Sequence, residues 1–139
     1  MICRQHTTLD KRLKSHNLKS TALRQKLLDV FEHTQKPLSA KDIFKLWPKE
    51  KIGKVTLYRG LEALKKAGLI KQLLFSSDTG YYESADKPHH HHLICNACGG
   101  IKSVQKCATA PSFAALKKAG FARVDSHSLE FFGLCKNCA

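Results

Sequence analysis

The chain has 139 residues, of which 42% are hydrophobic and 25% charged, and its formal net charge is +13. This composition excludes collagenous and low-complexity polymers, and the length suits one ordinary domain or two small domains with thin cores. No apolar run approaches the roughly 20 residues of a membrane span, and charges interrupt the N-terminus where a signal peptide is apolar, so we expect a soluble cytoplasmic protein.

The first predicted element is an amphipathic helix that begins after Ser20. Leu23, Leu27 and Phe31 repeat at helical spacing, and serine is a residue type that caps helix N-termini. We expect this helix to end near residues 33–37.

Two further helices are predicted before the pattern changes. Ser39 and Asp42 make a capping-box pattern that opens a short helix, and Pro48 stops it. Residues 54–67 predict the third helix, with Gly68 in the position where a glycine commonly ends a helix.

A β-hairpin is predicted after the third helix, from residues 69–75, a polar turn at 76–80 and residues 81–83. Three helices followed by a hairpin is the element order of a winged helix, in which the helix before the wing enters the major groove of DNA. Residues 54–67 are therefore the expected recognition helix.

A domain boundary is predicted at residues 86–88, because Pro88 disfavours a regular element across this segment. We expect an α+β protein with a winged-helix DNA-binding domain over residues 1–85 and a small α/β domain over residues 86–139. The second domain is predicted to contain a helix at 112–118 ended by Gly120, and short strands at 93–95, 101–105, 121–124 and 129–134.

The two predicted domains differ in charge. Residues 1–85 carry 17 Lys and Arg against 8 Asp and Glu, whereas residues 86–139 carry 7 against 3. A polyanion such as DNA is the natural partner of the first domain. The alternative is a generally basic, solvated surface.

The strongest signal in the sequence is a pair of CxxC motifs, one at residues 95–98 and one at residues 135–138. Two such pairs on tight turns can meet in a tetrahedron around zinc, and four thiolates close a structural site. The alternative is two redox or unliganded thiol pairs, but neither motif has the βαβ surroundings of a thioredoxin. We therefore predict one structural Zn²⁺ bound by Cys95, Cys98, Cys135 and Cys138.

Four consecutive histidines, at residues 89–92, form the second signal. In an extended segment successive side chains point to opposite sides, so His89 pairs with His91 and His90 pairs with His92. Each pair could bind a different metal ion. The alternative is a solvated His-rich linker.

Four motifs occur together along the chain: TLYR at 56–59, HHHHLICNACG at 89–99, His127-Ser128 and the final CxxC. From about Leu13 to Cys138, this combination resembles the ferric uptake regulator superfamily of bacterial metal-dependent repressors. The resemblance implies a homodimer with an N-terminal winged helix and a C-terminal dimerisation domain. It also implies that metal bound between the domains sets the affinity for DNA.

The resemblance implies roles for particular residues. DNA contacts are expected from the basic and recognition-helix positions Lys14, Arg24, Lys54, Thr56, Tyr58 and Arg59. A regulatory hinge site for a divalent metal is implied for Glu83, His90 and His92, and an additional metal site is implied for His89, His91 and His127. Taken alone, each basic residue could be a solvated charge, and Tyr58 could be a partly buried core aromatic.

Two positions depart from the family's pattern. Pro37 stands where the family often has a histidine, and Ala110 stands where it often has a glutamate. His33 and Cys107, each about one helical turn away, are candidate substitutes. A histidine at a helix end is, however, more often a surface residue.

The implied function is a metal-responsive transcriptional repressor that controls metal-uptake genes and has no small organic substrate. Imidazole-rich sites, with His91 where iron-sensing relatives tend to have aspartate, favour Zn²⁺ over Fe²⁺ or Mn²⁺. We therefore expect a regulator similar to the zinc uptake regulators, while iron, manganese, nickel and peroxide sensing stay open. A zinc hydrolase or deaminase is disfavoured because the sequence has no HExxH and no HxE upstream of Cys95. The other alternative is a zinc-ribbon adaptor that does not sense metal.

Overall fold

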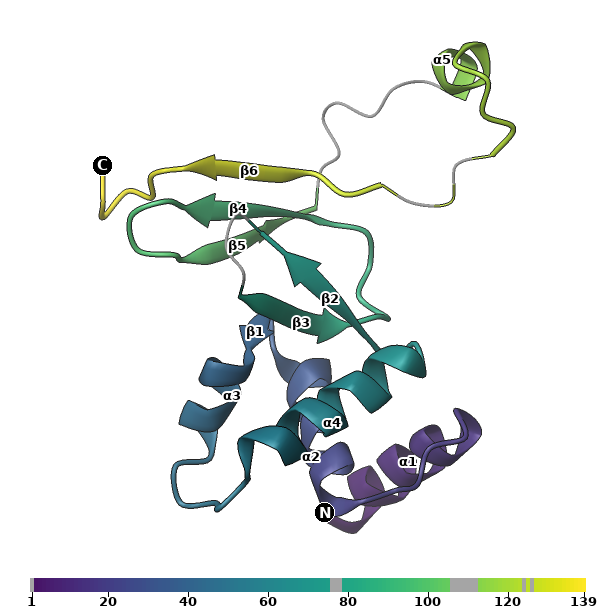
Figure 1. The fold of residues 1–139 in the computed structure, drawn as a ribbon, viewed down its shortest axis with the longest axis vertical. Coiled ribbons are helices and arrows are strands. Elements are labelled where there is room, and N and C mark those ends of the chain that lie inside the picture. The colour runs from purple at the N-terminus through teal and green to yellow at the C-terminus, as the bar shows by residue number, and fades with distance from the viewer. Residues whose placement is uncertain (1, 76–78, 106–112, 124, 126) are drawn as a thin grey trace. The chain divides into compact units, whose positions relative to one another are not determined.

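The computed structural model describes residues 2–75, 79–105, 113–123, 125 and 127–139 of the chain. They belong to two compact units, Met1–Lys87 and Pro88–Ala139, whose elements are drawn in Figure 1. Among the described residues, no helix has the length and apolar character needed to cross a membrane.

The first unit is a winged helix. Its described elements are α1 (Ile2–Ser15), α2 (Ala22–His33), β1 (Leu38–Ser39), α3 (Ala40–Leu46), α4 (Lys54–Lys66), β2 (Ile70–Leu74) and β3 (Gly80–Ser84). The strands form an antiparallel sheet in the order β1-β3-β2. The predicted three helices and hairpin are confirmed. Helix α1 and strand β1 are additions that the sequence pattern did not indicate, and residues 76–78 of the predicted turn lie outside the described residues.

The first helix boundary differs from the prediction by one residue. The N-cap of α2 is Thr21 rather than Ser20, and the Thr21 hydroxyl accepts a hydrogen bond from the backbone N–H of Arg24 at 3.3 Å. Ser20 instead accepts a hydrogen bond from the side chain of Gln25 at 2.7 Å. Serine is on average a slightly better N-cap than threonine, so the local sequence favours Ser20, and the backbone path decides which of the two adjacent hydroxyls faces the helix end.

The ends of α3 and α4 follow their local sequence signals. The capping box is present, because Ser39 and Asp42 exchange side-chain to backbone hydrogen bonds at 3.2 and 2.9 Å. Helix α4 ends where Gly68 takes a φ of 76°, and the N–H of Leu69 donates to the carbonyl of Leu64 at 3.0 Å. Glycine adopts this left-handed conformation without the cost of a Cβ clash.

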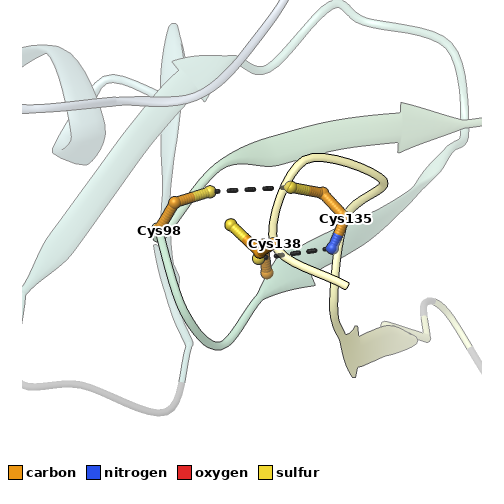
Figure 2. Close-up of side chains that lie close together, drawn as sticks. Cys98, Cys135 and Cys138 are labelled. Carbon is orange, nitrogen blue, oxygen red and sulfur yellow. Dashed lines mark hydrogen bonds between the residues drawn. The ribbon is translucent and has the colours of Figure 1, made fainter.

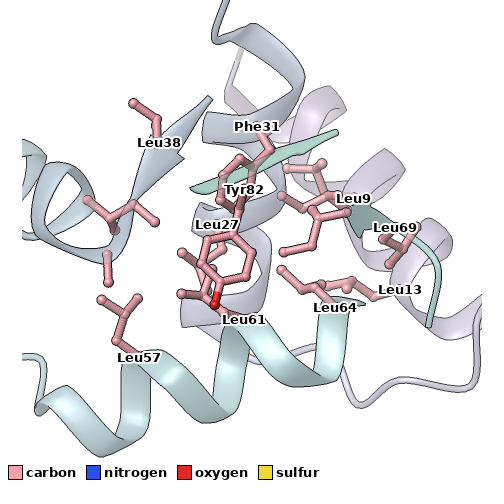
Figure 3. Close-up of a cluster of buried hydrophobic side chains, with 14 residues drawn as sticks. Leu9, Leu13, Leu27, Phe31, Leu38, Leu57, Leu61, Leu64, Leu69 and Tyr82 are labelled. Atoms are coloured by element: carbon pink, nitrogen blue, oxygen red, sulfur yellow. The ribbon is translucent and has the colours of Figure 1, made fainter. Parts of the chain in front are cut away.

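The core of the first unit joins all of its long helices to the hairpin (Figure 3). Helix α4 contributes a buried face made of Leu57, Leu61 and Leu64. Gly60 lies on the same side of α4, and a Cβ built there would approach Leu27 of α2 to 3.0 Å, so the two helices are in close contact. The buried cluster is Leu9, Leu13, Leu27, Leu28, Phe31, Leu38, Ala40, Ile43, Leu57, Leu61, Leu64, Leu69, Ile70 and Tyr82.

We expect Leu61→Ala to destabilise the first unit by about 2–5 kcal/mol, because Leu61 is fully buried and its truncation leaves a cavity. Urea unfolding followed by the fluorescence of Trp47, the single tryptophan, measures this effect in the first unit. Leu74→Ala is the matched control, since Leu74 is 68% exposed, and it should change stability by no more than about 0.5 kcal/mol. Equal effects of the two substitutions would contradict the assigned core.

The second unit is a small α/β domain whose described elements are β4 (His91–Cys95), β5 (Ile101–Val104), α5 (Phe113–Lys118) and β6 (Glu130–Gly133). The sheet order is β5-β4-β6, with β4 antiparallel to β5 and parallel to β6. The predicted helix and three of the predicted strands are confirmed. The strand predicted at 121–124 is wrong for residues 121–123, which form no strand, and Val124 lies outside the described residues.

The second unit has little apolar core of its own. Among its described residues, the buried hydrophobic side chains are those of Ile94 and Cys95, and the other buried side chains are the imidazoles of His91 and His92. Domains with so small a core need disulfides, metals or a partner chain for stability.

Candidate metal centres and nucleic-acid interface

The four cysteines of the two CxxC motifs meet at one end of the second sheet, and Figure 2 shows three of them, Cys98, Cys135 and Cys138. Cys95 ends β4, Cys98 lies in the following turn, and Cys135 and Cys138 follow β6. Their sulfur atoms all lie within 4.8 Å of one another, and those of Cys98 and Cys135 are 3.9 Å apart. Tetrahedral zinc with Zn–S bonds of about 2.3 Å places its sulfurs about 3.8 Å apart, so this spacing fits zinc.

Backbone geometry directs the sulfurs inward. The parallel pairing of β4 with β6 sets Cys95 opposite Gly133, and the N–H of Asn96 donates to the Gly133 carbonyl at 2.8 Å. The Cys95 sulfur accepts a hydrogen bond from the N–H of Cys135 at 3.4 Å. The Cys98 sulfur accepts one from the N–H of Gly100, also at 3.4 Å. Backbone N–H groups of this kind stabilise thiolates.

The four thiols influence one another's ionisation. The backbone N–H groups of Cys98 and Cys135 lower the pKa of Cys95 to about 6. Hydrogen bonds shared with the sulfurs of Cys135, Cys98 and Cys95 raise the pKa of Cys138 to about 12. The cluster by itself therefore favours thiolate at one position and resists it at another. A dication removes that conflict, because coordination deprotonates thiols. The four cysteines thus fit a structural Zn²⁺.

The histidine run alternates sides along the chain. His90 and His92 approach each other with 3.2 Å between their Nε2 atoms, and the Nε2 atoms of His89 and His91 are also 3.2 Å apart. His127 lies beside the pair formed by His89 and His91. The centroid of its ring is 4.4 Å from that of His89 and 5.3 Å from that of His91. The candidate ligand atoms of His89, His91 and His127 all lie within 4.8 Å of one another. The run therefore presents two separate histidine groups.

Two further observations bear on metal binding by these imidazoles. The Nδ1–H of His90 is positioned to donate to the backbone carbonyl of Pro88 at 2.7 Å, which leaves its Nε2 lone pair facing His92. His91 is only 1% exposed, and its Nδ1 has no hydrogen-bond partner among the described residues. A buried polar atom of this kind is costly unless an ion or a water satisfies it.

Glu83 lies in the first unit, on β3, with its side chain fully buried. Its Oε1 is 3.0 Å from the ammonium of Lys71, its partner in the antiparallel β2–β3 register, and its Oε2 is 3.9 Å from that of Lys87. Burial lowers the pKa of Lys87. Sequence reasoning missed both lysines, although the hairpin register places Lys71 opposite Glu83. A metal ion at Glu83 has to compete with these two ammonium groups.

His33, one of the two candidate substitute ligands, does not join these groups of possible metal ligands. His33 has an exposed side chain, which hydrogen-bonds to the backbone carbonyl of Asp29 at 2.8 Å, and this bond raises the pKa of His33. Within the described parts of the chain, His33 belongs to no group of side chains close enough to hold a metal ion. Cys107 and Ala110 lie outside the described residues.

Helix α4 presents polar and basic residues opposite its buried face. Lys54, Thr56 and Arg59 are exposed, and Tyr58 is 41% exposed, so Tyr58 is not a core aromatic. The N-cap, Gly53, provides no side-chain hydrogen bond to the helix end. The first N–H groups of α4 therefore point outward without a side-chain cap, which is the arrangement that favours phosphate.

The other two expected DNA contacts lie on α1 and α2. Lys14 has an exposed side chain near the end of α1, where its ammonium is 2.8 Å from the carboxylate of Asp10. Arg24 is half-buried in the first turn of α2, and its guanidinium donates to the backbone carbonyl of Lys19 at 2.9 Å. Lys14 is free to exchange a surface ion pair of low energy for a phosphate, whereas Arg24 also supports the local chain path.

Known proteins share this architecture. Residues 15–132 match the model of the ferric uptake regulator family. The ferric uptake regulation protein of Neisseria meningitidis is 34% identical over 134 residues, with 91% of this chain and 90% of that protein covered.

Solved structures of similar proteins match both units. The ferric uptake regulator of Helicobacter pylori, described as having three functional metal binding sites, superposes with a TM-score of 0.73 at 26% identity, covering 99% of this chain and 93% of that one. The iron-containing regulator of Francisella tularensis gives a TM-score of 0.70 at 30% identity, covering 87% and 94% of the two chains.

Proposed function

This chain belongs to the ferric uptake regulator family of metal-responsive transcriptional regulators, and we propose that it is a repressor whose affinity for DNA rises when it binds Zn²⁺. It is not an enzyme, since members of this family regulate transcription. The observation that supports zinc best is the imidazole-rich donor set at residues 89–92, together with His127. For a given set of nitrogen ligands, affinity rises from Mn²⁺ and Fe²⁺ towards Zn²⁺.

In this proposal the chain holds two kinds of zinc. Cys95, Cys98, Cys135 and Cys138 close a structural site that adds to the small apolar core found among the described residues of the second unit. His90 and His92 belong to an exchangeable regulatory site, and we assign Glu83 to the same site as its carboxylate ligand. We assign His89, His91 and His127 to an additional site.

The proposed switch acts through the chain between Glu83 and His90. An ion held by ligands from both units restricts the positions that the two winged helices of a dimer can take. The metal-free protein samples more positions, and fewer of them match successive major grooves of DNA. A coupling free energy of about 1–3 kcal/mol corresponds to roughly 5- to 150-fold tighter DNA binding.

We propose that α4 is the recognition helix. We assign its exposed Tyr58 and Arg59 to contacts with base edges and phosphates, and Lys54, Thr56 and the N–H groups of the first turn, which have no side-chain cap, to contacts with the DNA backbone. Lys14 and Arg24 are proposed as supporting contacts from α1 and α2. The excess of basic residues in the first unit supports this assignment.

The second unit supports a homodimer. Its described strands expose large apolar side chains, with Leu93 42%, Phe131 41% and Phe132 46% exposed, and Leu134 just beyond β6 is 60% exposed. Leu93 and Phe131 are neighbours in the β4–β6 register. An apolar surface on so thin a domain is stabilised when a second copy covers it.

Iron is the second candidate for the sensed metal, because the relatives at 33–34% identity are named ferric uptake regulation proteins. The two candidates differ in which metal starvation relieves repression. Affinity in vitro does not separate them, since Zn²⁺ binds more tightly than Fe²⁺ to most sites of this kind.

The test has two stages. First, the zinc-loaded protein selects a DNA duplex from a random library. The dissociation constant of the complex between protein and duplex is then measured with and without added Zn²⁺, on protein that retains its structural zinc. We expect roughly 5- to 150-fold tighter binding with Zn²⁺. A reporter under this duplex should then be derepressed in cells starved of zinc and stay repressed in cells starved of iron. Derepression by iron starvation alone identifies an iron sensor, and equal affinity with and without metal rules out the switch.

A further inference from the structure

Val55 is an exposed apolar residue on a basic helix. It is 63% exposed, in the first turn of α4. It precedes the buried Leu57 by two residues, which is a rotation of about 200° around the helix axis, so its side chain points away from the core. It is not among the partly buried residues packed against that core.

Neither helix stability nor packing accounts for a valine at this position. β-Branched residues have a lower helix propensity than the alanine, lysine or glutamate that commonly occupy exposed helical positions. The methyl groups of Val55 also make no contribution to the electrostatic attraction of phosphate. A side chain that serves neither purpose and faces outward is available for an apolar contact with a ligand.

The neighbours of Val55 define the chemistry of that ligand. Tyr58 follows it by three residues and Arg59 by four, so all three lie on one side of α4. Lys54 is exposed immediately before it, and the uncapped N–H groups of the first turn lie beside it. Cations and free amides around a small apolar group favour a polyanion that carries methyl groups over an apolar protein surface.

We propose that Val55 is a specificity-determining residue that recognises thymine through its C5-methyl group in the DNA major groove. Thymine is the base that presents a methyl group in that groove, and apolar side chains distinguish it there. This inference rests on the proposed function of α4 as the recognition helix. It adds to that function a base preference, carried by one side chain that forms no hydrogen bonds.

The test removes the methyl groups from each side of the contact. In the selected duplex, each thymine is replaced in turn by deoxyuridine, which keeps the base pair and lacks the C5-methyl group. For the wild-type protein with Zn²⁺, we expect at least one position in each half-site where the substitution weakens binding about fourfold, the value of one buried methyl group. Val55→Ala removes both γ-methyl groups, so in this variant the same substitution should weaken binding clearly less than fourfold.

Two controls separate a base contact from a change in the helix. Val55→Thr keeps the β-branch and one methyl group, and should keep a reduced penalty at the same position. Leu74→Ala removes an apolar side chain that is 68% exposed on β2, and should leave every deoxyuridine penalty at its wild-type value. Deoxyuridine penalties that are absent in the wild type, or identical in Val55→Ala, overturn the inference while leaving metal-dependent DNA binding intact. Failure to bind any duplex overturns the proposed function and this inference together.

Discussion

Cys135→Ser is expected to remove the structural zinc and unfold the second unit while the first unit stays folded. A residue that only hydrogen-bonds to a metal ligand, without binding the metal itself, already lowers metal affinity by about 10- to 100-fold when it is lost. The loss of a thiolate that binds the metal directly should lower the affinity further. The effect on folding is large because few apolar side chains are buried among the described residues of this unit. Zinc binding of about 10–16 kcal/mol is typical of small domains that depend on the metal to fold.

The readouts are zinc content per chain and the stability of each unit. The wild-type protein should retain one zinc that mild chelation does not remove, and Cys135→Ser should lose it and expose the apolar residues of β4 and β6 to hydrophobic dyes. Trp47 fluorescence should still report a folded first unit. Cys3→Ser is the control, since Cys3 lies outside both CxxC motifs, and it should keep the full zinc content. A Cys135→Ser protein with unchanged zinc content and stability would show that the four sulfurs do not form the site.

His92→Ala is expected to abolish the response of DNA binding to metal without unfolding the protein. His92 is buried on β4 and faces the Nε2 of His90 at 3.2 Å, so its removal takes one of the proposed regulatory ligands. The roughly 5- to 150-fold effect of Zn²⁺ on DNA affinity should fall to about one. Affinity in the absence of metal should stay at the wild-type value, because α4 is unchanged.

Structural zinc provides the internal check for this variant. His92→Ala should still contain one tightly bound zinc per chain, which shows that the four-cysteine site and the second sheet are intact. His16→Ala is the matched control, because His16 is an exposed histidine of the first unit whose Nδ1 bonds to the carbonyl of Arg12 at 2.9 Å. It should keep the full response to Zn²⁺. A His92→Ala protein that still responds to Zn²⁺ would move the regulatory site to other residues.

Local sequence reveals only part of the geometry of each of these two sites. A CxxC motif brings its own two sulfurs together, because its four residues span a single tight turn. It does not show how the second pair is brought to the first. That is decided by the parallel pairing of β4 with β6, which sets Cys95 opposite Gly133 and brings the last five residues beside the first motif. Parallel pairing between segments far apart leaves no local sequence signal.

The histidine run is similar. Alternation along a strand separates His89 and His91 from His90 and His92, and this follows from extended backbone alone. The approach of His127 to His89 and His91 depends on the fold of the second unit. The two lysines beside Glu83 depend in the same way on the register of the hairpin and on burial of the carboxylate.

The sequence by itself determined the elements whose signals are local: the apolar periodicity of α2 and α4, the Ser39–Asp42 capping box, the glycine that ends α4, and the two cysteine motifs. Only the tertiary structure decided the choice of Thr21 over Ser20 as a cap, the helix α1 that completes the core, the strand β1 paired with β3, and the absence of a strand at 121–123. The physical reason is that propensities and caps act within a few residues, whereas strand pairing and burial are stabilised by contacts between distant segments, which a single sequence does not display.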